Sequence, residues 1–251
     1  RTISSLFIGG EKLEIVAHWR PGLNEEPVRL GEVPSTMDYE FAGDNRFERV
    51  YAGNQTSGIG RRNSEWVTDP EGIAATWRLD SMNGLSPGIL QIGVGAELSS
   101  SFNMHLKWPN DIVDNEYRKC GGVLCKLQKD GSVRIGVGIN RYAQHVPEME
   151  TTGWNVSLPN MPKSTALCVA DAALASALDA HPLIGKPNLE NLRISAWKAI
   201  SKILSRGSRA TVGGAEMRVV RIEENGEIIL SLGSLIHLVG AVDEVSWQVA
   251  I

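Results

Sequence analysis

Charged side chains in three short segments could stabilise negative charge on a bound ligand. Arg61 and Arg62 are adjacent, and guanidinium groups bind phosphates or carboxylates through paired hydrogen bonds. Lys107 and Asp111 flank the proline of "KWPND", and carboxylate oxygens are ligands that Mg²⁺ prefers. Lys119 stands before two glycines in "KCGGV" and could neutralise a carboxylate and an α-phosphate together. These residue types predict a site that holds anionic groups.

The segment that carries the arginines, residues 51–72, also contains features typical of ligand contact. Gly58 and Gly60 let backbone approach a ligand closely, and Trp66 could cover an aromatic base. We expect a mobile segment that closes over a flat, negatively charged ligand. A solvated basic turn with one packed tryptophan is the alternative. Similarly, "KWPND" could be a capped turn, and Lys119 could be an ordinary lysine of an edge strand.

Composition sets limits on the function. The chain has 251 residues, a net charge of −4 and 42% hydrophobic residues, which indicates a globular protein. The negative charge disfavours a nucleic-acid partner. Three cysteines and no long apolar run predict a cytoplasmic protein without a membrane span.

The elements that must position these residues follow from hydrophobic periodicity and turn residues. Asn225-Gly226 predicts a hairpin turn, and the chain changes at about residue 206 to short strands, which favours a small β-barrel. We therefore expect an α+β fold, with a mixed sheet and packed helices at 1–205 and a C-terminal β-barrel domain at 206–251. Strands are expected at 12–19, 28–33, 46–53, 72–80, 104–109, 120–128 and 132–140, and helices at 34–42, 86–102, 165–180 and 189–204.

Four segments in this order resemble the catalytic module of biotin protein ligases. They are "GIGRRNSEW", "KWPND", "RKCGGVL" and "IGVGIN", and "STM" at 35–37 is similar to a further motif of that family. The resemblance covers about residues 28–250. It implies the class II synthetase-like fold of biotin and lipoate ligases, with a small SH3-like barrel at the C-terminus.

The resemblance also implies an activity. Biotin and ATP would form biotinyl-5′-adenylate with Mg²⁺, and a lysine of a biotin carboxyl carrier domain would then accept the biotin. Some family members carry an N-terminal helix-turn-helix, but the residues before the module read as strands here, so DNA binding is not expected. The oligomeric state is left open, with a homodimer as one alternative.

Roles of single residues are implied by the resemblance alone. Catalysis would depend on Lys119, Arg61, Lys107 and Asp111, with Asp111 also the metal ligand. The biotin ureido ring would contact Ser35, Thr36 and Gln55, and the pocket would include Gly121 and Gly122. Gly58 would help to hold the carboxylate and phosphate, Trp66 would flank adenine and Asn140 would bond its edge. Further ligand contacts are expected at Gly60, Arg62, Asn110, Gly136 and Gly138.

The sequence departs from the family pattern in the glycine-rich segment. Ile59 stands where the family usually has a basic residue, Ser64 replaces another, and one residue is inserted before Pro70. Loss of a charged hydrogen bond costs about 1.5–3 kcal/mol, so the adenylate could be held more weakly. The alternatives are a lipoate or octanoate ligase of the same fold, and a biotin-binding homologue with weakened catalysis.

Overall fold

The computed structural model describes residues 4–8, 11–15, 27–41, 47–79, 86–178, 209–212, 214–223, 225–239 and 246–248. The helix expected at 189–204 lies outside the described residues. No helix in the described part of the chain is both long enough and apolar enough to cross a membrane.

A seven-stranded mixed sheet forms the centre of the molecule, in the order β3-β4-β7-β11-β10-β9-β8. Strands β3 and β4 are parallel, and every other neighbouring pair is antiparallel. The strands are β3 (Val28–Val33), β4 (Phe47–Gln55), β7 (Ile73–Leu79), β8 (His105–Lys107), β9 (Asp111–Val113), β10 (Lys119–Leu127) and β11 (Val133–Ile139).

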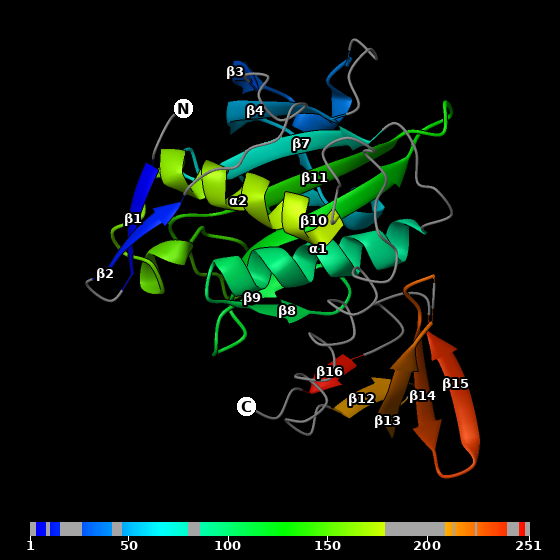
Figure 1. The fold of residues 1–251 in the computed structure, drawn as a ribbon. Coiled ribbons are helices and arrows are strands. Elements are labelled where there is room, and N and C mark those ends of the chain that lie inside the picture. The colour runs from blue at the N-terminus through cyan, green and yellow to red at the C-terminus, as the bar shows by residue number, and fades with distance from the viewer. Residues whose placement is uncertain are drawn as a thin grey trace.

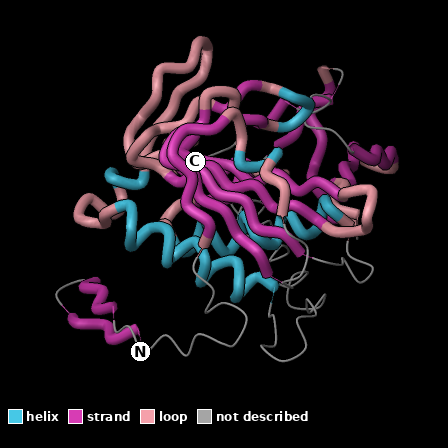
Figure 2. The backbone as a smooth tube through the Cα atoms, turned by 90° about the horizontal axis from the view of Figure 1, so that it is seen from above, coloured by secondary structure: helices cyan, strands magenta, loops and turns pink. Residues whose placement is uncertain are grey.

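Two helices, α1 (Pro87–Ser101) and α2 (Lys163–Leu178), lie side by side on one face of this sheet (Figure 1). Helix α1 begins where the Ser86 hydroxyl accepts the Ile89 N–H at 3.2 Å. Pro87 fits the first turn because the backbone N–H that proline lacks would have no partner within the helix at that position. The view from above separates the helices from the strands that they cover (Figure 2).

A buried polar cluster joins α2 to the sheet. The Asp171 carboxylate accepts from the Tyr51 hydroxyl at 2.5 Å and from Trp77 Nε1 at 2.8 Å, and Arg49 Nε lies 3.1 Å from it. Burial and the neighbouring carboxylate raise the pKa of Tyr51 above its usual value. The neutral phenol can therefore act as a hydrogen-bond donor to the sole acidic member of this cluster.

The C-terminal strands form a second sheet, in the order β15-β14-β13-β12-β16. Met217, Val219, Ile228 and Leu230 of this sheet belong to the same buried cluster as the core of the main body. The turn predicted at Asn225-Gly226 is confirmed, because it joins β13 to β14. The strands are β12 (Arg209–Val212), β13 (Ala215–Ile222), β14 (Ile228–Leu232), β15 (Leu235–Val239) and β16 (Ser246–Gln248).

The smaller elements complete the described chain. They are the hairpin of β1 (Ser4–Ile8) and β2 (Glu11–Ile15), the ribbon of β5 (Gly58–Ile59) and β6 (Glu65–Trp66), and the 3-10 turns η1 (Thr36–Asp38), η2 (Arg61–Asn63) and η3 (Trp154–Val156).

The α+β class with a mixed sheet is confirmed, and most expected elements occur within two residues of their predicted bounds. The closed C-terminal barrel is not seen, because the five C-terminal strands form an open sheet in the described residues. The helix predicted at 34–42 is shorter than expected. Ser35 does cap it, accepting the Met37 N–H at 3.2 Å, but the turn ends at Asp38.

Candidate active site

A cavity of about 410 Å³ lies on the face of the sheet opposite to the helices. Adjacent side chains of β7 mark the two faces, since Trp77 bonds α2 whereas Thr76 bonds η1. The cavity is lined by Ser35, Thr36, Met37, Gln55, Ile59, Gly60, Arg61, Arg62, Ser64, Glu65, Trp66, Ala75, Asn110, Asp111, Lys119, Gly122, Val123, Leu124, Gly136, Val137 and Gly138.

One group of lining residues is an ordered polar cluster. Gln55 Oε1 accepts from the Thr36 N–H at 2.8 Å and from the Thr36 hydroxyl at 3.1 Å, and Gln55 Nε2 donates to the Thr68 hydroxyl at 3.2 Å. The Thr76 hydroxyl donates to Thr36 Oγ1 at 2.9 Å. Because each side chain is held by another, these donors and acceptors are oriented before any ligand binds.

The floor of the cavity is glycine backbone. Gly136 and Gly138 are two residues apart on β11 and therefore face the same side. A methyl group at position 136 would lie 2.5 Å from Met37 Sδ, and one at position 138 would lie 2.5 Å from Trp66 Cε2. Only glycine lets both side chains rest on this strand.

The glycine-rich segment is a tight ribbon rather than an irregular loop. Gly58 pairs with Trp66 and Ile59 with Glu65, and the Gly60 N–H donates to the Ser64 carbonyl at 2.7 Å. The turn at its tip puts Arg62 at a φ of 54°, a conformation that is uncommon for residues with side chains. The ribbon places Ile59, Arg61 and Trp66 in the cavity wall.

Opposite charges meet at the wall of the cavity. Lys119 Nζ lies 2.7 Å from Asp111 Oδ1 and 5.7 Å from the centre of the Trp66 ring. Burial and the neighbouring Arg62 lower the pKa of Arg61, and Asp111 acts in the opposite direction. Trp66 Nε1 is buried and makes no hydrogen bond within the described part of the chain. The wall therefore presents cations beside an indole donor.

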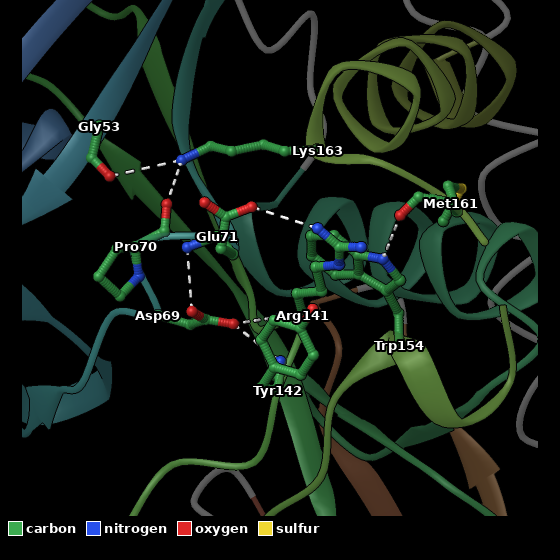
Figure 3. Close-up of polar contacts among 9 residues, drawn as sticks. All are labelled: Gly53, Asp69, Pro70, Glu71, Arg141, Tyr142, Trp154, Met161 and Lys163. Carbon is green, nitrogen blue, oxygen red and sulfur yellow. Dashed lines mark hydrogen bonds and ion pairs between the residues drawn. The ribbon is translucent and has the colours of Figure 1, made fainter. Parts of the chain in front are cut away.

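The chain after the ribbon is anchored by a buried carboxylate and a lysine (Figure 3). Asp69 accepts from the backbone N–H groups of Arg141 and Tyr142, both at 2.8 Å, and Lys163 Nζ donates to the Pro70 carbonyl at 2.7 Å. Burial lowers the pKa of Lys163. The C-terminal end of the ribbon is thus fixed to the end of β11 and the start of α2.

Solved structures of biotin ligases share this architecture. A biotin protein ligase from Aquifex aeolicus in complex with biotin and ATP is 21% identical, with a TM-score of 0.69 over 90% of this chain and 99% of that one. A biotin protein ligase from Leishmania major in complex with biotinyl-5-AMP gives 20% and 0.58 over 85% and 98%. A biotin acetyl coenzyme A carboxylase synthetase from Helicobacter pylori with bound biotinylated ATP gives 17% and 0.54 over 85% and 100%.

The chain has the biotin protein ligase fold. It matches no protein-family model. At these identities the likeness establishes the fold.

Within the biotin ligase fold, most of the residues predicted from the sequence lie together. Thirteen of them line the cavity, namely Ser35, Thr36, Gln55, Gly60, Arg61, Arg62, Trp66, Asn110, Asp111, Lys119, Gly122, Gly136 and Gly138. Four lie outside its lining: Gly58, Lys107, Gly121 and Asn140. Sequence reasoning missed Met37, Val123, Leu124 and Val137 as lining residues. Leu124 shares a face of β10 with Gly122, and Met37 follows Ser35-Thr36, so these two could have been indicated. Val123 and Val137 alternate to the other face, where they belong to the core, and had no such signal.

The positions outside the cavity have structural contacts of their own. A methyl group on Gly121 would lie 2.5 Å from the Gly138 carbonyl oxygen, so this glycine allows close strand pairing. Asn140 Oδ1 accepts the Asp69 N–H at 3.1 Å, and its amide donates to the Val67 carbonyl at 3.4 Å. In this structure Asn140 therefore holds the chain that follows the ribbon.

Proposed function

We propose that this protein is an ATP-dependent biotin–protein ligase. The observation that carries the proposal is the meeting of Lys119, Arg61 and Asp111 in the wall of a glycine-floored cavity that also contains an ordered polar cluster. Such a cavity suits a substrate that has a neutral polar group at one position and a carboxylate at another. Biotin has this form, with a ureido ring and a valerate chain.

The ureido ring is assigned to the polar cluster. A ureido group offers two N–H donors and one carbonyl acceptor, and Ser35, Thr36 and Gln55 supply hydroxyl and amide partners. Gly136 and Gly138 let Met37 and Trp66 lie against β11, so these two side chains can border the bicyclic ring. Met37 and Leu124 supply apolar wall for the rest of the molecule.

The cationic wall is assigned to the reacting groups. A carboxylate oxygen of biotin attacks the α-phosphorus of ATP, the bond to the β-phosphate breaks, and pyrophosphate leaves. Negative charge is concentrated at the junction of carboxylate and phosphate, where Lys119 and Arg61 would stabilise it. For this to occur, Lys119 has to exchange its contact with Asp111 for contacts with the substrates.

Asp111 is the residue proposed to help hold Mg²⁺. The described residues contain no cluster of three or more metal-ligating side chains, which fits a cation that keeps several waters and is bound by one carboxylate and substrate phosphates. When bound, the ion would neutralise phosphate charge. Lys107 pairs with Asp111 across the β8–β9 hairpin and is proposed to support the phosphates from there.

In the second step a lysine of a biotin carboxyl carrier domain would attack the acyl carbon of the adenylate, and AMP would leave. We assign both steps to residues 1–205 in the cytoplasm, and we propose that residues 206–251 form a small domain of SH3-like type whose described strands make an open sheet.

The decisive experiment incubates the protein with labelled biotin, Mg-ATP and a biotin carboxyl carrier domain. We expect label on the carrier lysine and pyrophosphate release that depends on biotin. Transfer of lipoate or octanoate in place of biotin would support the alternative ligase. Binding of biotin without pyrophosphate release would instead indicate a homologue that has lost catalysis. The apolar Ile59 in the cavity wall, in place of a basic residue, would then be one cause of that loss.

A further inference from the structure

The C-terminal sheet touches the main body directly behind the Lys107–Asp111 segment. Trp108 Nε1 donates to the carbonyl of Gly226, in the turn between β13 and β14, at 3.0 Å. Both partners are buried, and the Trp108 side chain is 2% exposed. A buried indole N–H needs an acceptor, and the C-terminal sheet supplies it across 118 residues of sequence.

The turn that provides this carbonyl is hydrogen-bonded and closely fitted. Asn225 Oδ1 accepts the Glu227 N–H at 3.0 Å, and the Gly226 N–H donates to the Glu223 carbonyl at 2.9 Å. Gly226 has a φ of 89°, which favours glycine. A methyl group on Gly226 would lie 2.7 Å from the backbone carbonyl carbon of Gly88, so no other residue fits without movement.

Helix α1 meets the same turn from another side. A methyl group on Gly88, in the first turn of α1, would lie 2.1 Å from the Asn225 carbonyl oxygen. Glycine at position 88 therefore permits a contact that alanine, a better helix former, would prevent. Gly88 and Trp108 together hold the turn in one position.

The segment held in this way faces the cavity on its other side. Asn110 and Asp111 line the cavity, and the Asn110 carbonyl accepts the Val123 N–H of β10 at 3.0 Å. The segment is therefore fixed on one side by the sheet and on the other by the C-terminal turn. A shift of the turn would move Asp111 relative to Lys119.

From these contacts we infer that the turn at Asn225-Gly226 is a positioning element for the phosphate-binding side of the site, and that Trp108 is the residue through which it acts. The inference rests on the proposed function for its kinetic consequences, but not for its structural ones. The C-terminal sheet would then set the efficiency of adenylation without contacting the substrates.

The test compares two buried tryptophans whose indole N–H groups each donate to a backbone carbonyl, one of the C-terminal turn and one elsewhere in the main body. Trp108→Phe removes the N–H that bonds Gly226. Trp154→Phe is the matched control, because Trp154 is fully buried and its Nε1 donates to the Met161 carbonyl at 3.2 Å (Figure 3). Gly88→Ala displaces the turn without altering residues 107–111.

Two readouts are measured on the full chain at a temperature where all variants are folded. We expect faster hydrogen exchange in residues 105–113 and in the turn for Trp108→Phe and Gly88→Ala, but not for Trp154→Phe. In biotin-dependent pyrophosphate release, kcat should fall about ten- to a hundred-fold and the KM for ATP should rise, while the KM for biotin stays unchanged.

The outcomes separate the inference from the proposed function. If Trp108→Phe and Trp154→Phe lose stability alike and neither changes exchange at 105–113, kcat or the KM for ATP, Trp108 is only a core residue and the inference is overturned. If the wild-type protein releases no pyrophosphate, the proposed function fails, and the exchange measurement alone decides whether the turn positions the segment.

Discussion

Lys119 is the residue on which the proposed chemistry depends most. It lies on β10 with its ammonium group 2.7 Å from Asp111 and 5.7 Å from the centre of the Trp66 ring. A partly buried ion pair beside an aromatic ring keeps the lysine extended toward the cavity. The same placement would let it meet the carboxylate and α-phosphate as charge develops between them.

Replacing Lys119 by alanine should therefore remove chemistry and leave the fold. We expect biotin-dependent pyrophosphate release to fall by about 10²–10³-fold, the usual loss when one preorganised donor is removed. The free energy of unfolding should change by only about 0–1 kcal/mol, because the pair with Asp111 is still reached by solvent.

Lys126→Ala is the matched control, since Lys126 lies on the same strand but outside the cavity lining. It should keep the wild-type rate. A Lys119→Ala protein that forms adenylate at the wild-type rate would remove Lys119 from the mechanism.

At the scale of single residues, the sequence could indicate which side chains gather but not all their contacts. Both Gly121 and Gly122 were expected at the ligand; Gly122 lines the cavity, whereas Gly121 permits close pairing with β11. Alternation along the strand separates the two, but only the register with β11 shows which one faces the ligand. The contact of Asn140 with Asp69 spans 71 residues and has no local signal.

At the scale of elements, regular periodicity was sufficient where strands and helices are long. The predicted range 132–140 matches β11 (Val133–Ile139), and 86–102 matches α1. The ribbon of β5 and β6 could not be predicted in this way, because strands of two residues have no periodicity. Its pairing depends on Gly58 and Gly60, because side chains at these positions would clash with Trp66 and Ser64.

The tip of the ribbon is expected to open and close relative to its two ends. Asp69 and Lys163 anchor its C-terminal end, whereas its own pairing consists of two residue pairs, and Arg62 holds a left-handed conformation that costs free energy. Ligands that bind Arg61 and cover Trp66 would stabilise the closed form and exclude water from the adenylate.

Limited proteolysis with trypsin can measure this opening. Cleavage after Arg61 or Arg62 should be fast in the free protein and slow with biotin and ATP together. Lys129, in the turn between β10 and β11 and away from the cavity, provides an internal control whose cleavage should not respond to ligands. Equal cleavage of the ribbon in both states would mean that it is a static turn.

At the scale of the whole molecule, the sheet separates two functions. One face carries the helices and the buried cluster around Asp171, and the other carries the cavity. The C-terminal sheet joins the core from the side of Trp108. Changes on the helix face should therefore alter stability without altering the site, which makes the Asp171 cluster a measure of folding alone.

The Tyr51 hydroxyl gives this cluster a defined pH dependence. Its pKa is raised from 10.0 in the folded protein, because burial and the Asp171 carboxylate disfavour the phenolate. A raised pKa means that the stabilisation is complete below the unfolded value and is lost as the pH rises above it. The free energy of unfolding should therefore fall as the pH increases beyond about 10.

Tyr51→Phe tests this effect, since the variant lacks the hydroxyl whose pKa is raised. At about pH 8 the variant should unfold with about 1–2 kcal/mol less free energy than the wild type, because Asp171 loses a donor. At about pH 11 the difference should shrink, because the wild type then has to keep a proton that its unfolded chain would release. Urea unfolding at both pH values measures the two differences. Tyr142→Phe is the control, since Tyr142 is exposed and lies outside the Asp171 cluster. A difference for Tyr51→Phe that stays constant between the two pH values would show that its hydroxyl is not held against the carboxylate.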